Sequence, residues 1–218
     1  MKISYAITVC NEFVEIQNLV NFLIRNKRPQ DEIVVQQDKA CKKSASHTPL
    51  TPEMEVNLYC GNLDREGQIK FICDFALDGH FANFKNNISK YCSGDYIYQI
   101  DADEMPSLYM IEALPEVLEN NNVDVILVPR INTVEGLTQE HVNKWGWMVN
   151  NKGWVNFPDY QWRVYKNVKN IKWTRKIHEF LEGYKTVACL PTEEEWCLKH
   201  PKTLTKQEKQ NEFYNTLI

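Results

Sequence analysis

The first nine residues alternate between apolar and polar positions in the way that is typical of a β-strand. Apolar or aromatic side chains stand at positions 3, 5, 7 and 9, which predicts a strand that ends before Asn11. From Asn11 to about Arg25 the apolar residues recur at helical spacing, and Asn11 is placed to cap the start of this helix. The run Ile33–Val35 then predicts a buried strand with Asp38 at its carboxyl end. The chain therefore begins as strand, helix, strand.

Similar patterns predict alternating elements up to residue 130. Residues 39–53 are polar, contain two prolines and predict a surface loop. Further strands are expected over Met54–Cys60, Tyr96–Ile100 and Val123–Pro129. Further helices are expected over Gln68–Leu77, His80–Tyr91 and Ser107–Asn120. Beyond residue 130 the chain becomes aromatic, polar and irregular, with short strands and a charged final helix from about Thr205.

This order of elements favours an α/β fold with a mostly parallel sheet flanked by helices. In open sheets of this kind, ligands bind beyond the carboxyl ends of the strands. Three polar groups stand at such ends in this sequence: Cys10–Glu12, Asp38 and Asp101–Asp103. We therefore expect these groups to lie together at one edge of the sheet.

Composition narrows the class of protein. The 218 residues fit one domain. A formal net charge of -4 with dispersed lysines argues against nucleic acid as the main partner. The seven cysteines are odd in number and form no CxxC pair, which predicts neither a disulfide framework nor a structural zinc site. No stretch approaches the roughly 20 apolar residues of a membrane span, so a cytoplasmic protein with reduced thiols is expected.

Two carboxylates separated by one small residue follow the strand Tyr96–Ile100. Positions i and i+2 of a strand face the same side, so Asp101 and Asp103 can converge on one site while Ala102 leaves room for a ligand. Such oxygen ligands suit Mg²⁺ or Mn²⁺ bridging a diphosphate. A solvated acidic turn that caps the helix after Pro106 is the alternative interpretation.

The motifs before this pair resemble those of family 2 glycosyltransferases of the GT-A fold. They stand in the order of that family: Thr8–Glu12, Asp38, Phe84–Ile88 and Ser93–Ile97. The later stretches Pro158–Tyr165 and Ile177–Glu179 are similar to small, non-processive bacterial or viral members that build surface saccharides. Lys85 stands where the family usually has an arginine.

The resemblance implies a GT-A-like, Rossmann-like fold in a single domain. Residues 1–130 would bind the nucleotide sugar, and residues 131–218 would supply irregular, aromatic-rich acceptor-side and C-terminal elements. The residues expected at the nucleotide sugar are Thr8, Asn11, Glu12, Asp38, Lys85, Asn86, Asp101, Ala102 and Arg163. Asn11 and Glu12 have helix capping as an equal alternative. The residues expected at the metal are Asp101, Asp103 and His200.

An inverting transfer also needs a carboxylate to take the proton of the acceptor hydroxyl. Glu179 is the first candidate for this base and Asp159 the second. The tryptophans around residues 145–162 are expected partly in the core and partly as walls for sugar rings, with Trp145 and Trp147 on a mobile acceptor loop. Residues 202–209 predict a solvated helix face, with contact to an anionic lipid-linked acceptor as the alternative.

Together these features predict transfer of a hexose from a UDP-sugar, with UDP-glucose favoured, to a hydroxyl of a saccharide or lipid-linked saccharide. Mn²⁺ or Mg²⁺ would be the cofactor. A sugar-phosphate nucleotidyltransferase is one alternative, but it would have a glycine-rich loop after the first strand, and no glycine precedes Gly61. A non-catalytic saccharide-binding module that uses only the tryptophans is the other.

Overall fold

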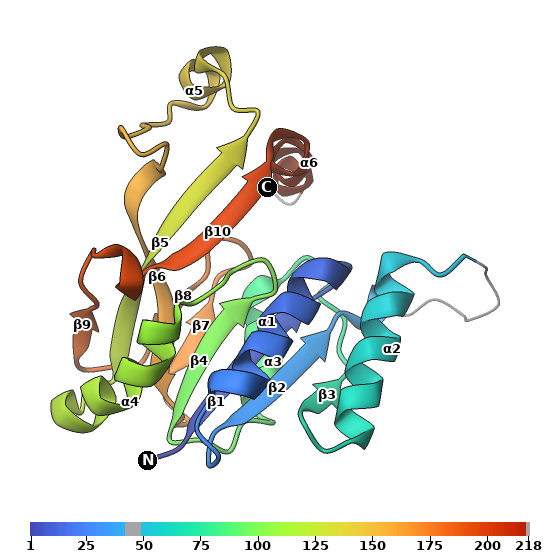
Figure 1. Cartoon of the computed structure of the whole chain (residues 1–218), viewed down its shortest axis with the longest axis vertical. Coiled ribbons are helices and arrows are strands. Elements are labelled where there is room, and N and C mark those ends of the chain that lie inside the picture. Colours follow the sequence, from blue (N-terminus) through green and yellow to red (C-terminus); the bar gives the residue numbers. More distant parts are fainter. Residues whose placement is uncertain (42–48, 217–218) are drawn as a thin grey trace.

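A computed structural model describes residues 1–41 and 49–216 of the chain (Figure 1). The strands are β1 (Ile3–Val9), β2 (Glu32–Gln37), β3 (Lys70–Ile72), β4 (Tyr96–Asp101), β5 (Val125–Glu135), β6 (Val155–Lys166), β7 (Lys172–Thr174), β8 (Phe180–Glu182), β9 (Val187–Cys189) and β10 (Leu198–Thr203). The α-helices are α1 (Phe13–Asn26), α2 (Pro52–Arg65), α3 (Phe81–Ser89), α4 (Leu108–Asn121), α5 (Gln139–Trp145) and α6 (Leu204–Asn215). Short 3₁₀ turns are η1 (Lys39–Cys41) and η2 (Glu194–Trp196).

The main sheet has the strand order β10-β5-β6-β4-β1-β2-β3, and β9 also pairs with β5. Among the strands of the described residues, only β6 runs antiparallel to its neighbours in this sheet. The mostly parallel α/β sheet predicted from the sequence is therefore confirmed. At its centre, Thr8 of β1 lies opposite Gln36 of β2 and Asp101 of β4. The carboxyl ends of these three strands consequently meet at one edge.

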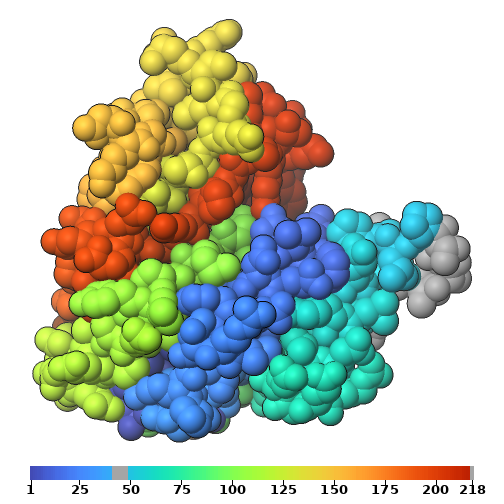
Figure 2. Space-filling view, in the orientation of Figure 1, coloured from blue at the N-terminus to red at the C-terminus, as the bar shows by residue number. Residues whose placement is uncertain are grey.

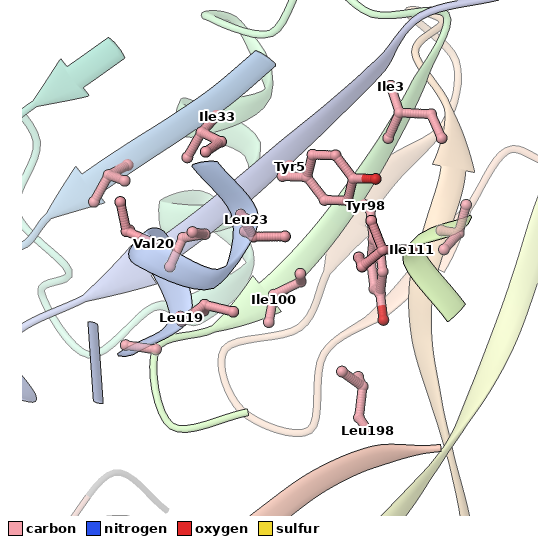
Figure 3. Packing of buried hydrophobic residues seen from close by; sticks show 14 of the residues in the cluster. Ile3, Tyr5, Leu19, Val20, Leu23, Ile33, Tyr98, Ile100, Ile111 and Leu198 are labelled. Carbon is pink, nitrogen blue, oxygen red and sulfur yellow. The ribbon is translucent and has the colours of Figure 1, made fainter. Parts of the chain in front are cut away.

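Helices α1, α2 and α4 cover one face of the sheet, as Figure 1 shows. Alternation along the strands directs every second side chain, such as Tyr5 of β1 and Tyr98 of β4, toward these helices. Leu19 and Leu23 of α1 are fully buried in the same cluster as these strand side chains (Figure 3). This larger core holds β1 and β4 in place and so holds their polar ends.

The other face of the sheet is covered by α3 and by the β7–β8 hairpin. The intervening strand residues, including Ala6, Val34 and Ile97, point this way and pack with Ile88 of α3 and Trp173 of β7. The side chains here are fewer, and the polar Gln36 and Asn87 are buried between them and hydrogen-bond each other at 2.8 Å. This layer carries Lys85 and the hairpin with Glu179 toward the same edge of the sheet.

Two elements before residue 80 differ from the sequence prediction. The segment Met54–Cys60, expected as a strand, lies inside helix α2 because Pro52 starts a helix whose buried positions Val56, Cys60 and Leu63 follow helical spacing. The segment Gln68–Leu77, expected as a helix, contains β3 instead. Its residues pair with the edge of β2, and this tertiary contact outweighs local propensity.

The second half is more regular than the sequence suggested. β5 extends past residue 130 to Glu135, and β6 is a 12-residue strand, where only short strands were expected. Irregularities in the β5–β6 register, at Ile126/Leu127 and Arg130/Asn132, interrupt the alternation that would have revealed these strands. Strands β5, β6, β9 and β10 thus complete the same sheet that β1, β2, β3 and β4 begin.

Helix α5 and the turns around it form an arm that projects from the body of the molecule (Figure 2). Trp145 packs on Trp147 with ring centroids 4.6 Å apart, and Trp154 packs on Phe157 at 4.7 Å. The side chain of Asn156 accepts a hydrogen bond from the backbone of Met148. These contacts connect neighbouring turns of the arm, with Trp145 at the end of α5, and the mobility expected from the sequence stays a prediction. No helix in residues 1–41 and 49–216 combines the length and apolar character needed to cross a membrane.

The packing of α1 leads to a first prediction. Leu23→Ala removes a fully buried side chain and should lower the free energy of unfolding by about 2–5 kcal/mol. Val14→Ala changes a side chain of the same helix that is 63% exposed, and its effect should stay within about 0.5 kcal/mol. Urea denaturation followed by circular dichroism measures both. Equal effects of the two substitutions would show that α1 does not pack on the sheet in this way.

Candidate active site

A cavity of about 970 Å³ opens at the carboxyl ends of β1, β2 and β4. This volume suits a ligand of the size of a nucleotide sugar. Nearly all site residues predicted from the sequence line it: Thr8, Asn11, Glu12, Asp38, Lys85, Asp101, Ala102, Asp103, Asp159, Arg163, Glu179 and His200. The exception is Asn86, whose side chain exchanges two hydrogen bonds with the backbone of Trp173 and so fastens α3 to β7.

Asp101 ends β4 and is held by three donors. The hydroxyl of Thr8 donates to its Oδ1 at 3.0 Å, Lys85 Nζ lies 3.5 Å from the same oxygen, and Arg163 Nη2 donates to Oδ2 at 2.7 Å. Burial raises the pKa of the Asp101 carboxyl, but the charges of Arg163 and Lys85 outweigh burial and place the pKa well below its ordinary value. Asp101 is therefore an ionised, fixed carboxylate.

Glu104 is a fully buried carboxylate that the sequence analysis did not single out. Its Oε1 accepts hydrogen bonds from Arg163 at 2.6 Å and from Arg130 at 2.9 Å. Its Oε2 accepts from the backbone N–H of Asp101 at 3.1 Å, which closes the turn after β4. Glu104 thus joins two strands, through their arginines, to the loop that carries Asp101 and Asp103.

Asp159 lies on β6 and is surrounded by donors. Arg130 donates to its Oδ2 through Nε at 2.9 Å and Nη2 at 2.8 Å, Asn132 donates to the same oxygen at 2.8 Å, and Gln161 donates to Oδ1 at 2.6 Å. Burial raises the pKa of Asp159, and the charge of Arg130 with these hydrogen bonds more than offsets it, so that the pKa is lowered. The Asp159 carboxylate is ionised and already occupied by protein donors.

His200 and Asp103 face each other across the cavity wall. Because the amide nitrogen of Asn132 donates to Asp159, its oxygen is the atom that meets His200 Nδ1, at 2.7 Å. Nδ1 must therefore carry the proton of a neutral imidazole. Burial is the main cause that lowers the pKa of His200, which keeps the ring neutral. Nε2 lies 3.4 Å from Asp103 Oδ2, and this carboxylate opposes the effect of burial on the pKa of His200.

This pair fits part of a divalent metal site. An imidazole lone pair and a carboxylate oxygen are both metal ligands, and an orienting hydrogen bond on the opposite ring nitrogen is usual for metal-bound histidine. No three His, Cys, Asp or Glu side chains converge tightly enough to hold a metal by themselves in the described part of the chain. A cation here would need further ligands such as phosphate oxygens or water, as is common for Mg²⁺.

The loop with Asp103 and the strand with His200 are clamped to each other. The backbone N–H of Met105 donates to the carbonyl of Lys199 at 2.8 Å, and the N–H of Lys199 donates back at 2.9 Å. In the sheet, His200 lies opposite Asn132 of β5. These backbone contacts lie two residues from Asp103 and one residue from His200. They therefore fix the distance between the two candidate metal ligands.

Lys202 and Lys206 line the cavity, where the sequence predicted a solvated helix face. Lys206 Nζ lies 3.2 Å from Asp103 Oδ2 and 3.3 Å from Glu15 Oε1. Lys202 contacts the side-chain oxygens of Gln207 and Gln210. Burial lowers the pKa of Lys202 to about 8. Because β10 turns directly into α6, these two side chains face the cavity, while no residue of α6 is buried and the helix keeps a solvated face.

Glu179 reaches the cavity from the turn between β7 and β8. Two non-glycine residues of this turn, Arg175 and His178, have positive φ angles of 71° and 51°, a conformation that costs energy outside glycine. Lys85 Nζ lies 2.5 Å from Glu179 Oε1 and also approaches Asp101. Burial raises the pKa of Glu179, while the charge and hydrogen bond of Lys85 outweigh it and lower the pKa.

At the other end of the cavity, backbone groups hold the first two strand ends. Asp38 Oδ1 accepts from the N–H groups of Ala40 and Leu77, at 2.9 and 3.1 Å. Glu12 occupies the N-cap position of α1, where Asn11 was expected, and its carboxylate turns back to the N–H groups of Cys10 and Asn11. Cys10 is disulfide-bonded, contrary to the expectation of reduced thiols.

Comparisons with known proteins identify the fold. No protein-family model matches the chain, and no curated protein matches it. The crystal structure of S. aureus TarS 1–349 in complex with UDP-GlcNAc matches with a TM-score of 0.62 at 14% identity, over 93% of this chain and 59% of that chain. The complex with UDP gives 0.60 at 14% identity, over 92% and 60%. The structure of S. aureus TarS gives 0.59 at 12% identity, over 97% and 38%.

This likeness confirms a GT-A-like, Rossmann-like fold for the chain. The chain spans about 60% of the length of the TarS 1–349 structures that it matches. The matched region extends over nearly all of this chain, so it includes both the first strands and the aromatic second half. The expectation of a GT-A-like α/β fold, drawn from the sequence, agrees with the structural comparison.

The buried position of Glu104 leads to a second prediction. Glu104→Gln removes the charge shared by Arg130 and Arg163 and should destabilise the protein toward the lower end of about 3–5 kcal/mol, because each arginine keeps one other carboxylate. Glu194→Gln is the control, since its ion pair with Lys199 is half exposed and should contribute less than about 1 kcal/mol. Urea denaturation of both variants tests this. A loss below 1 kcal/mol for Glu104→Gln would contradict the interpretation.

Proposed function

We propose that this protein is a glycosyltransferase that moves a hexose from a UDP-sugar to a hydroxyl of a saccharide or lipid-linked saccharide. The observation that carries the proposal is the convergence of Asp38, Asp101 and Asp103 on one cavity at the carboxyl ends of three adjacent strands. Open α/β sheets bind their ligands in this place. Positively charged lysine and arginine side chains, which a diphosphate needs as partners, also line the cavity.

The UDP-sugar donor is supported by the neighbours of the same fold. TarS was crystallised with UDP-GlcNAc and with UDP. In this chain, the Asp38 carboxylate suits a hydrogen bond from a nucleobase, and Thr8 and Glu12 border the same space. UDP-glucose stays our favoured donor among the hexoses, and transfer with inversion follows from the family resemblance.

Mn²⁺ or Mg²⁺ is the proposed cofactor, and Asp103 and His200, with Asp101 beside them, are the residues that would hold it. When bound, the cation would supply positive charge to the departing diphosphate. The chain supplies the supporting groups: Arg163 and Lys85 hold Asp101 ionised, and Asn132 directs the lone pair of His200 toward Asp103. These groups are oriented by buried hydrogen bonds before any ligand enters, which is the arrangement that stabilises developing charge most effectively.

The acceptor proton needs a carboxylate with a free lone pair near the donor sugar. Asp159 already accepts four hydrogen bonds from protein side chains. Glu179 accepts a side-chain hydrogen bond from Lys85 at Oε1. Glu179 also lies on the same cavity as Asp101, to which Lys85 links it. Glu179 is therefore the better candidate for the general base, and Asp159 a residue that orients Arg130 and Asn132.

A saccharide-binding module would explain less of this site. Such a module binds through aromatic faces and a few hydrogen bonds and has no need of buried ion pairs, which are costly to desolvate. Arg163 and Glu104 are both almost completely buried and pair directly. A buried ion pair of this kind is expected in an active site, where charged groups must keep fixed positions during the reaction.

The donor and the cofactor are tested together by UDP release. The protein incubated with a panel of UDP-sugars and Mn²⁺ should release UDP from one of them, and EDTA should abolish the release. Asp103→Ala should lower the rate by at least about 100-fold, because it removes a ligand of the cation and a partner of His200. A coupled assay for free UDP measures the rate.

Glu194→Gln, at an exposed position outside the cavity, is the control for this assay and should release UDP at the parental rate. Absence of UDP release from every sugar, together with absence of UDP binding by calorimetry, would reject the UDP-sugar proposal. UDP release that EDTA does not abolish would reject the proposed role of the metal and would keep the UDP-sugar donor.

The general base is tested by comparing Glu179→Gln with Asp159→Asn. Glu179→Gln should lower kcat by about 10²–10⁴-fold while UDP affinity is retained. Because a base works only when deprotonated, parental activity should fall as the pH drops through the lowered pKa of Glu179, and this acidic limb should disappear in Glu179→Gln. Loss of the limb in Asp159→Asn instead would assign the base to Asp159.

A further inference from the structure

The end of the described chain brings two ammonium groups to the DxD loop. Lys202 is on β10, two positions after His200, and Lys206 is in the first turn of α6. The hydroxyl of Thr203 accepts a hydrogen bond from the backbone N–H of Lys206, which fixes this turn. Both lysines line the cavity that contains Asp103.

Lys202 differs from the other buried and half-buried cations of the site because no carboxylate of the described residues lies beside it. Lys85, Arg130, Arg163 and Lys206 each have a carboxylate oxygen within 4.0 Å, and Lys209, which also lines the cavity, is exposed to water. In the described part of the chain, Lys202 has no carboxylate at that distance, and its contacts are the oxygens of Gln207 and Gln210. Withdrawal of an ammonium ion from water without a counter-charge is unfavourable. The position therefore suits an anion that enters from the cavity.

Lys206 is also placed to meet such an anion. It bridges Asp103 and Glu15, which lie on different elements, and its side chain remains 35% exposed. The ammonium group of Lys206 is therefore accessible to a ligand that enters beside Asp103. Arg163 and Lys85, in contrast, are almost completely buried, and each is already paired with two carboxylates, Asp101 and Glu104 for Arg163 and Glu179 and Asp101 for Lys85.

We infer that Lys202 and Lys206 bind the diphosphate of the nucleotide donor beside Asp103, an inference that rests on the proposed function. Arg163 and Lys85 stand beside Asp101, so the two lysines supply the positive charge at the other carboxylate of the pair. Ammonium groups bind phosphate oxygens as point charges and do not demand one fixed geometry. This suits a group whose charge increases during the reaction.

The bonds and charges of the transfer show where these lysines act. The bond between the anomeric carbon and the diphosphate oxygen breaks, and its electron pair stays on that oxygen. The acceptor oxygen forms the new bond to the anomeric carbon, and its proton passes to the carboxylate base. Lys202 and Lys206 donate hydrogen bonds to the diphosphate as it gains this charge, which lowers the barrier.

Calorimetric titrations in EDTA test the inference without the metal. The probes are inorganic diphosphate, UDP and uridine, and the proteins are the parent, K202M, K206M and the double variant. Methionine keeps much of the length of the side chain and removes its charge. The double variant should bind diphosphate and UDP at least about 10-fold more weakly than the parent, with unchanged affinity for uridine. Lys199→Met is the matched control on β10, since its side chain is 55% exposed and outside the cavity.

Equal affinity of the parent and the double variant for inorganic diphosphate, or no binding by the parent, overturns the inference. Diphosphate binding through the lysines without binding of uridine or UDP would keep the inference and reject UDP as the nucleotide. The double variant K202R/K206R retains both charges and should bind diphosphate within about threefold of the parent. If it binds as weakly as the methionine variant while melting at the parental Tm, positive charge is not the property that matters, and the inference fails.

Discussion

A buried carboxylate between two guanidinium groups connects the parts of this protein that form its site. Glu104 accepts hydrogen bonds from Arg163 of β6 and Arg130 of β5, and its second oxygen closes the turn after β4. One side chain thereby joins the end of β4 to the interior of β5 and of β6. Because a buried charge without its partners is far more costly than an exposed one, the strands cannot separate at this edge without a large loss of free energy.

From this triad the polar contacts continue around the cavity. Arg163 leads to Asp101 and through Lys85 to Glu179, whereas Arg130 leads through Asp159 and Asn132 to His200 and Asp103. Each member orients the next, so the ionised oxygens and the imidazole lone pair have fixed directions. Cooperative networks of this kind keep their geometry better than isolated pairs do. The apolar core beneath them, between α1 and the sheet, provides the rigid support.

The first strands, α1 and the DxD pair could be predicted because they follow from local patterns of apolar and polar residues. The nucleotide-side residues, such as Thr8 and Asp38, were expected from the family resemblance, and nearly all of the predicted site residues line the cavity. Prediction from local patterns failed for residues 54–60, where Pro52 and the burial of Val56 and Cys60 select a helix although the local alternation suggests a strand. The roles of Glu104 and Arg130 depend on contacts between strands that are distant in the sequence, and no local spacing reveals them. The inward direction of Lys202 and Lys206 likewise follows only from the place of β10 beside β5.

The clamp between Met105 and Lys199 has a mechanical consequence. Two backbone hydrogen bonds tie the DxD loop directly to the strand that carries His200. The loop and the strand therefore form one rigid unit, and the spacing of Asp103 and His200 does not depend on the conformation of the projecting arm or of the β7–β8 hairpin. A rearrangement of those outer elements would leave the two side chains at the same separation.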